Sequence, residues 1–258
     1  MNTKIDITAP GKKEEIGAEH IIPKTLREIE NIFSRMGFEI VQGPEVDSEK
    51  YNFDAVNVPR DHPARDMQDT FWIDGVEETV LRTHTSNTQG RYMEKHKPPI
   101  RIIVPGRVFR NESTDATHEA QFHQVEGLVV GKEISLANLK ATLLNFLKEF
   151  FGKEANIRIR PGYFPFVEPG IEADVTCHKC GGKSGNKTCN VCKGSGWIEV
   201  LGAGMVHPNV LKFGNIDPEK YQGFAFGLGI ERMVMLKYGV EDVRNFYDGN
   251  IPFMEQFK

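Results

Sequence analysis

This chain of 258 residues has no long apolar run. No stretch approaches the roughly 20 consecutive apolar residues that a membrane-spanning helix needs, and the opening MNTKIDITAPGKK lacks the apolar segment of a secretory signal. A strong excess of one charge is also absent, because 32 basic residues face 36 acidic ones and the net charge is −4. We therefore expect a cytoplasmic protein that would meet nucleic acid through a local basic patch or a partner chain.

Cysteine is scarce, and its placement argues against a disulfide framework in a chain without an export signal. All the cysteines lie within residues 177–192 and form two Cys-x-x-Cys pairs: Cys177, Cys180, Cys189 and Cys192. Two such pairs supply the four thiolates of a closed tetrahedral site, so the spacing predicts a structural Zn²⁺. The alternative is a reduced loop of idle thiols. A metal knuckle here would staple the flanking strands or touch RNA, and we favour the staple.

Periodicity divides the chain into an N-terminal arm and one large domain. Residues 1–22 show no sustained period and are expected to form an arm or a truncated linker, whereas residues 23–258 read as a single domain. Apolar residues three or four positions apart predict helices from Pro23 to Gly37 and from Ser135 to Gly152, the latter with Leu136 on its apolar face. A last helix is expected to follow the segment GFAFGLG.

Short alternating segments supply the strand candidates: FEIVQGPEV, IRIIVPG, VFRNE, QFHQVEGLVV, NIRIRP, IEADV and WIEVLGAGM. Several follow one another too closely for a crossover helix, since a parallel connection needs about a dozen residues or more. The expected fold is therefore α+β, with a mainly antiparallel sheet flanked by helices and a small four-cysteine knuckle inserted at residues 177–192.

Two segments suggest chemistry. In a predicted hairpin, Arg110 and Glu112 would share one face of a strand, and Phe122 would share a face with the polar residues two and four positions later. Taken alone, such charges are typical of an exposed ion pair. The later Gly-x-Gly-x-Glu-Arg segment runs from a glycine-rich strand into a helix and places Arg232 in the first turns, which alone indicates a helix-surface arginine beside a tight turn.

Together, these segments resemble motifs 2 and 3 of the class II aminoacyl-tRNA synthetases, and the helix from Pro23 with the segment after it resembles motif 1. Longer segments narrow the resemblance to the family of phenylalanine–tRNA ligase α subunits: YNFDAVNVPRDHPARDMQDTF, LRTHTS, FHQVEGLVV, YFPFVEP, LGAGMVHPNVL and GFAFGLGIER. It extends from about residue 23 to the C-terminus. It implies ATP-dependent activation of L-phenylalanine to phenylalanyl-adenylate and transfer to tRNA(Phe).

The resemblance also implies residue roles in an ATP site. Arg110 and Arg232 are the implied catalytic residues, the first on the α-phosphate and the second on the distal phosphates, while Phe122 stacks on adenine. Two cations suit this reaction because a carboxylate must approach a polyanion. The remaining implied nucleotide contacts are Glu112, His118 and Glu231.

For the amino acid, the resemblance implies that four residues surround the carboxylate and ammonium groups: His84, Ser86, Gln124 and Glu126. Phe164 and Phe166, two apart on an extended segment, would face the substrate's phenyl ring from one side, and Ala225 would form the pocket floor. Without the resemblance, ordinary core packing is the simpler interpretation of these rings and of the alanine.

The implied partners are a β subunit in an (αβ)₂ heterotetramer, which carries the editing function, and tRNA(Phe). Glu168 would help to hold a Mg²⁺ ion shared with that β subunit. The α subunits of the family have an N-terminal coiled-coil arm, which the resemblance does not cover. Two alternatives remain: a class II synthetase for another amino acid, against which the Phe-Pro-Phe segment speaks, and a non-catalytic synthetase-like RNA-binding protein, which would be expected to lose the motif arginines.

Overall fold

A computed structural model describes residues 8, 11, 17–62, 70–183, 185, 189 and 191–257 of the chain. Most of the expected arm, and residues 63–69 within one of the resembling segments, lie outside these ranges. Among the described residues, no helix combines the length and apolar character needed to cross a membrane.

The centre of the domain is a seven-stranded sheet in the order β1-β4-β5-β9-β8-β7-β6. Every neighbouring pair is antiparallel except β1 with β4, which confirms the mainly antiparallel sheet expected from the short connections. The strands are β1 (Glu39–Ile40), β4 (Ile100–Phe109), β5 (Gln121–Gly131), β6 (Ile157–Phe164), β7 (Val167–Thr176), β8 (Trp197–Val206) and β9 (Gln222–Gly229).

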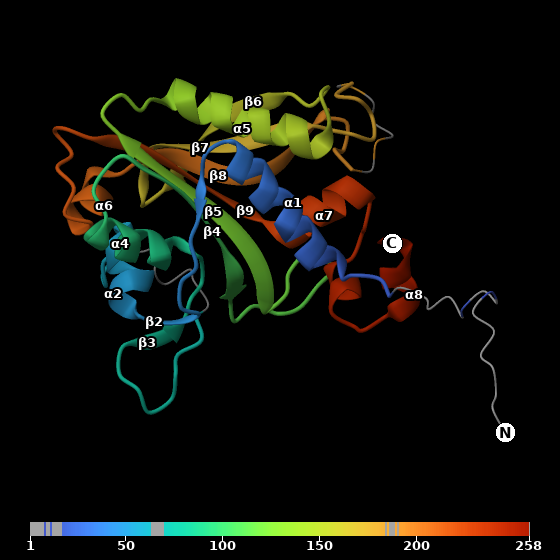
Figure 1. Ribbon diagram of the computed structural model, residues 1–258, viewed down its shortest axis with the longest axis horizontal. Coiled ribbons are helices and arrows are strands. Elements are labelled where there is room, and N and C mark those ends of the chain that lie inside the picture. The colour runs from blue at the N-terminus through green and yellow to red at the C-terminus, as the bar shows by residue number, and fades with distance from the viewer. Residues whose placement is uncertain are drawn as a thin grey trace.

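Three helices cover one face of this sheet: α1 (Ile21–Arg35), α5 (Leu136–Phe151) and α7 (Ile230–Tyr238), with the largest apolar core between them and the strands (Figure 1). Local sequence explains α5, because the Ser135 side chain and Asn138 form a reciprocal capping box at its start and Gly152 ends it. This confirms the boundaries expected for that helix. Leu136, however, is exposed, unlike the other apolar residues predicted for that face.

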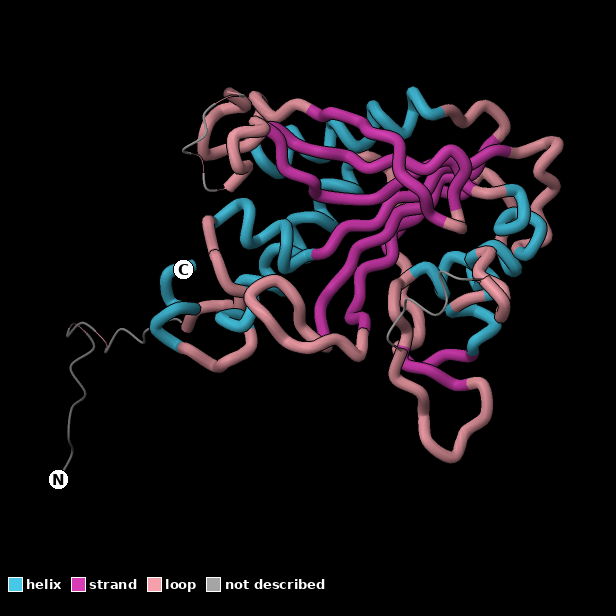
Figure 2. The backbone as a smooth tube through the Cα atoms, turned by 180° about the vertical axis from the view of Figure 1, so that it is seen from behind, coloured by secondary structure: helices cyan, strands magenta, loops and turns pink. Residues whose placement is uncertain are grey.

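Shorter elements pack at the other side of the molecule, where the sheet is not covered by the long helices (Figure 2). They are α2 (Glu49–Asn52), η1 (Asp54–Val56), α4 (Ser86–Lys95), α6 (Pro208–Phe213) and a small sheet of β2 (Val46–Ser48) and β3 (Thr79–Leu81). The chain continues beyond α7 into η2 (Val243–Phe246), α8 (Ile251–Met254) and η3 (Glu255–Phe257), so the helix after β9 is not the last one.

Two expected boundaries are wrong. Helix α1 begins at Ile21 rather than Pro23, because His20 accepts a hydrogen bond from the Ile22 amide as N-cap and both isoleucines are buried in the core. The segments IRIIVPG and VFRNE form one strand, and that strand ends at Phe109. The Glu112 amide instead donates to the Arg110 carbonyl at 2.8 Å, which turns the chain out of the ladder.

Candidate functional site

A cavity of about 700 Å³ lies on the sheet face opposite to α1, α5 and α7. Strand register explains why there is space. Glu126 on β5 pairs with Gly227 on β9, which pairs with Gly202 on β8, and Ala225 lies two residues before Gly227 on the same face. Apart from Glu126, these neighbouring positions carry glycine or alanine, and the cavity occupies the volume that larger side chains would fill.

Phe164 and Phe166 form one wall of the cavity. Their ring centroids are 5.8 Å apart and their planes differ by 21°. The prediction that both residues lie on one extended segment is wrong, because β6 ends at Phe164 and the next two residues form the tight turn into β7. A Cβ atom on Gly202 would lie 2.8 Å from the Phe164 ring, so glycine is needed beneath it.

Glu126 is the buried carboxylate of the cavity, with 7% of its surface exposed. Its Oε2 accepts hydrogen bonds from the Ser86 hydroxyl and from Gln89 Nε2, the latter at 2.9 Å. Burial raises the pKa of Glu126 from 4.5 to about 7, although Ser86 and the neighbouring arginines oppose that shift. The site therefore stabilises the negative charge only in part, and a bound cation would complete that stabilisation.

Two polar atoms in the cavity wall lack partners. Within the described ranges, His84 Nδ1 and Gln124 Oε1 are buried and make no hydrogen bond. Burial and the nearby Arg110 lower the pKa of His84 to about 3, so its imidazole is neutral. A buried polar atom without a partner is costly, which favours a ligand that bonds to both.

Arg110 supplies positive charge at the cavity, directly after β4 ends. Its Nε donates to the Thr83 carbonyl at 3.3 Å, and its guanidinium carbon lies 5.1 Å from the centre of the Phe122 ring. Burial lowers the pKa of this arginine, but a guanidinium remains charged throughout the physiological range.

The cavity brings together eight residues that the resemblance implies: His84, Ser86, Arg110, Gln124, Glu126, Phe164, Phe166 and Ala225. The other implied residues lie outside its lining. Glu112 and His118 belong to the loop between β4 and β5, where His118 contacts Asp115, and Glu168 is exposed on β7.

The two motif residues at the start of α7 differ in their surroundings. Glu231 is buried with 4% of its surface exposed, whereas Arg232 is exposed. In the part of the chain that the structure describes, the Arg232 side chain makes no ion pair or hydrogen bond. Its charge is therefore available to an external anion.

Sequence reasoning missed two residues next to Glu126. Gln89 lies one helical turn beyond Ser86 on α4, a spacing that would have indicated a shared face. Arg82 is only 2% exposed, and its guanidinium donates to the carbonyls of Arg107, Gly43 and Pro44. Those contacts join segments that are far apart in the sequence, so no local sequence pattern predicts them.

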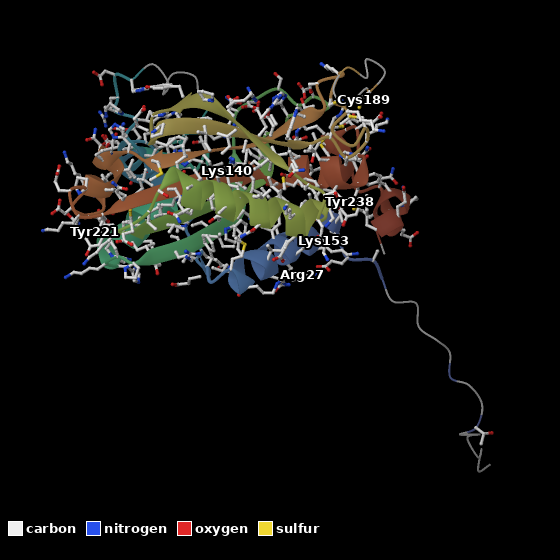
Figure 3. All side chains as sticks on the ribbon, turned by 90° about the horizontal axis from the view of Figure 1, so that it is seen from above. Arg27, Lys140, Lys153, Cys189, Tyr221 and Tyr238 are labelled. Carbon is white, nitrogen blue, oxygen red and sulfur yellow. The ribbon has the colours of Figure 1, made fainter. Side chains whose placement is uncertain are left out.

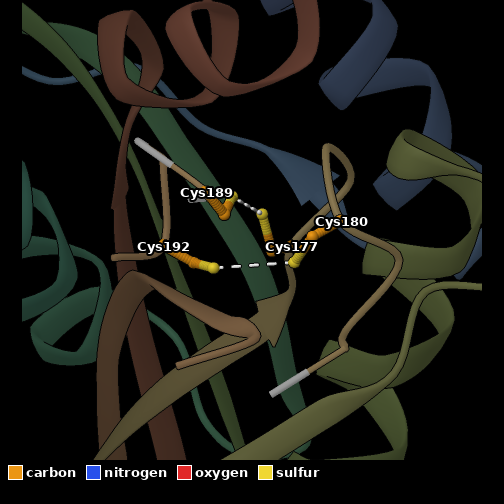
Figure 4. Close-up of side chains that lie close together, drawn as sticks. All are labelled: Cys177, Cys180, Cys189 and Cys192. Atoms are coloured by element: carbon orange, nitrogen blue, oxygen red, sulfur yellow. Dashed lines mark hydrogen bonds between the residues drawn. The ribbon is translucent and has the colours of Figure 1, made fainter. Parts of the chain in front are cut away.

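The cysteines form a second candidate site between β7 and β8. Their sulfur atoms all lie within 4.8 Å of one another, with Cys177 to Cys189 at 3.8 Å and Cys180 to Cys192 at 3.6 Å (Figure 4). Zinc–sulfur bonds of about 2.3 Å would place tetrahedral thiolates about 3.8 Å apart, so the donor set fits a metal ion. The Gly196 amide also donates to the Cys192 sulfur at 3.3 Å.

The cysteine cluster closes the end of a hairpin. The Cys177 amide donates to the Gly196 carbonyl at 2.9 Å, which extends the β7–β8 ladder into the cluster. Several glycines in the connection adopt positive φ, including Gly181, Gly182 and Gly194, and allow the tight turns. Cys189 lies at the margin of the molecule, away from Tyr221 at the other end of the sheet (Figure 3). A metal here could staple the hairpin.

The mainly antiparallel sheet, the helices on one face and the charged cavity on the other define the class II tRNA synthetase core. The family model for tRNA synthetases class II core domain (F) matches residues 4–257, a longer span than the resemblance from residue 23. A solved structure of pyrrolysyl-tRNA synthetase from Desulfitobacterium hafniense has a TM-score of 0.64 at 19% identity, covering 88% of this chain and 73% of that one. At that identity the similarity shows the fold alone.

Curated relatives narrow the class. The phenylalanine–tRNA ligase alpha subunit of Streptococcus uberis is 57% identical over 257 residues, which cover 98% of this chain and 72% of the relative. The protein of the same name from Streptococcus pyogenes serotype M49 is 56% identical over 256 residues, with the same coverage. The chain belongs to the family of phenylalanine–tRNA ligase α subunits, as its sequence segments had indicated.

Proposed function

We propose that this chain is the catalytic subunit that activates L-phenylalanine with ATP and transfers it to tRNA(Phe). The observation that carries the proposal is the composition of the cavity, in which a buried carboxylate and an unpartnered amide oxygen lie near Arg110 and a pair of phenyl rings. An amino acid with an aromatic side chain has complementary groups for each of these features.

The ammonium group of phenylalanine would take the position beside Glu126 and Gln124. Within the described residues, Gln124 Oε1 is an acceptor without a donor, and burial raises the pKa of the Glu126 carboxylate. A bound ammonium satisfies both groups. The carboxylate of the substrate would then face Arg110 and the neutral His84.

The phenyl ring would enter between the aromatic wall and the small residues of the sheet. Phe164 and Phe166 offer ring edges and faces, while Ala225 limits the depth of the floor. Tyrosine differs by one hydroxyl, which an apolar pocket rejects poorly. The family resemblance places the proofreading that this would require on the β subunit.

Adenylate formation needs positioning and charge neutralisation rather than a protein nucleophile. A carboxylate oxygen of phenylalanine attacks the α-phosphorus of ATP, the bond to the bridging oxygen breaks, and pyrophosphate leaves with that electron pair. Arg110 would neutralise the α-phosphate and Arg232 the departing phosphates, with Phe122 stacked on adenine and Glu112 and His118 at the nucleotide. A ribose hydroxyl of tRNA then displaces AMP from the acyl carbon.

Two metals belong to this proposal. Mg²⁺, when bound, supplies charge neutralisation, and Glu168 would hold an ion shared with the β subunit. Within the described ranges, the cysteines are the only group of three or more side chains placed to share a metal, so Glu168 needs ligands from a partner. We assign Zn²⁺ to the cysteines, because four closely spaced thiolates favour it and leave no open position for catalysis.

The test is amino-acid-dependent ATP–pyrophosphate exchange by the chain assembled with its candidate β subunit as (αβ)₂, screened over the standard amino acids. Phenylalanine should support exchange far better than any other, with tyrosine next. Omission of the β subunit measures how far the α chain depends on it. Equal exchange with several unrelated amino acids, or none at all, would overturn the proposal.

A further inference from the structure

The segment after α7 is tied to three separate parts of the molecule. The Val243 amide donates to the carbonyl of Ala116 in the β4–β5 loop at 2.9 Å. The Phe246 carbonyl is 2.8 Å from Nε2 of His20, the N-cap of α1. One residue further on, the Tyr247 hydroxyl donates to Glu231 at the start of α7.

Glu231 is fully engaged by the protein itself. Both of its carboxylate oxygens lie 3.0 Å from the backbone nitrogen of His123, and Oε1 is also 2.8 Å from His123 Nδ1. With the Tyr247 hydroxyl, these donors account for a carboxylate that is 4% exposed. This arrangement favours a structural link between elements over the nucleotide contact that the resemblance implied for Glu231.

The contacts of Glu231 with His123 and Tyr247 join the two elements that would hold ATP, β5 and the first turn of α7. His123 is on β5 between Phe122 and Gln124, and alternation places its side chain on the opposite face from theirs. Glu231 directly precedes Arg232 in the first turn of α7. A displacement of the Glu231 carboxylate would therefore move two backbone segments at once, the one that carries Phe122 and the one that carries Arg232.

We propose that Tyr247 is a positioning residue of the nucleotide site, acting through Glu231 on β5 and on the first turn of α7. The inference rests on the proposed function in one respect, that Phe122 and Arg232 contact ATP. Although 36% of the Tyr247 surface is exposed, partial desolvation of its hydroxyl and the charge of Glu231 raise the pKa of the phenol above its usual value, so it remains a donor at every physiological pH.

The experiment compares Tyr247→Phe with a matched control in the assembled (αβ)₂ enzyme. Tyr238→Phe removes a hydroxyl from α7 itself (Figure 3), and that hydroxyl has no hydrogen bond in the described ranges. Loss of the Tyr247 hydroxyl should raise the KM for ATP in pyrophosphate exchange about tenfold, the size expected from misplacing a positioning group by a fraction of an ångström. The KM for phenylalanine should change less than about twofold, because Glu126 lies three residues further along β5 than His123 and is held by Ser86 and Gln89 of α4.

A double-mutant cycle with Glu231→Gln tests the route. If Tyr247 acts through Glu231, then adding Tyr247→Phe to Glu231→Gln should change the KM for ATP little further. An additive effect would overturn the route, and a Tyr247→Phe enzyme with the ATP KM of the Tyr238→Phe control would overturn the role. Loss of active enzyme with both KM values unchanged would indicate stability alone, which also contradicts the inference.

Direct titration with ATP by calorimetry separates this inference from the proposed function. If the unaltered enzyme shows no phenylalanine-dependent exchange, the proposed function fails. The inference still stands or falls by whether Tyr247→Phe weakens ATP binding relative to Tyr238→Phe.

Discussion

The two ends of the β7–β8 hairpin differ in packing: one end borders open space, and the other closes over a cluster of side chains. At one end, Val167 pairs with Val206 beside the cavity, and small residues keep space open. At the other, Thr176 pairs with Trp197 and the chain closes over four thiols. The same two strands thus border a cavity that requires free volume for a substrate and a cluster of thiols that requires a metal ion between them. The cavity end should govern substrate binding, and the cysteine end should govern stability.

The largest expected effect is at the cysteine end. Replacing Cys177 and Cys192 with serine should abolish zinc binding and lower the free energy of unfolding by about 4 kcal/mol or more, as losses of structural metals do. Metal analysis by mass spectrometry and chemical denaturation measure the two quantities. Lys183→Ser, an exposed change in the same connection, is the control. A wild-type protein purified without a stoichiometric metal would refute the assignment.

The next effect is at the cavity end. Glu126→Gln removes the charge that would face the substrate ammonium. The activation free energy that corresponds to kcat/KM for phenylalanine should rise by about 2–5 kcal/mol, the range for truncating one partner of a buried charge pair. The folded stability of the variant should not fall. The carboxyl pKa rises from 4.5 to about 7 on folding, so its contribution to stability declines as pH rises through that window. The variant should therefore unfold no earlier than wild type at pH 8.

A pH profile sharpens the same contrast. Because burial raises the pKa of Glu126 to about 7, protonation below that value removes the partner of the ammonium group. The kcat/KM for phenylalanine should then fall about tenfold per pH unit below pH 7, while His84 stays neutral above pH 3. The Glu126→Gln enzyme should lack this limb. Its persistence in that variant would assign the titration to another group.

The smallest expected effect concerns the floor of the cavity. Ala225→Gly deepens the cavity by one methyl group. The free-energy difference that discriminates para-substituted phenylalanines from phenylalanine in kcat/KM should shift by about 1 kcal/mol in favour of the substituted substrates. Competitive pyrophosphate exchange with para-chlorophenylalanine measures the ratio. Unchanged discrimination would show that the para position of the substrate does not point at Ala225.

Local signals account for the elements that were predicted correctly. Helix α5 begins at a capping box and ends at Gly152, and both devices act within a few residues. The β4–β5 hairpin follows equally from a polar loop between two alternating segments. The wrong boundaries have mixed causes. Helix α1 extends back to Ile21 because the core buries that residue, a long-range effect that adds to the cap at His20. Strand β4 ends at Phe109 because the Glu112 amide bonds to the Arg110 carbonyl instead of continuing the ladder.

The candidate site divides in the same way. Residue types and spacing suffice to indicate the cysteine donors, the motif arginines and the family, because these depend on chemistry carried within short segments. Only the folded chain decides that Gly202, Ala225 and Gly227 lie side by side to leave a cavity, that Gln89 joins Ser86 on Glu126, and that Glu231 bonds to His123. Strand register sets such proximities, and register depends on packing between segments far apart in the chain.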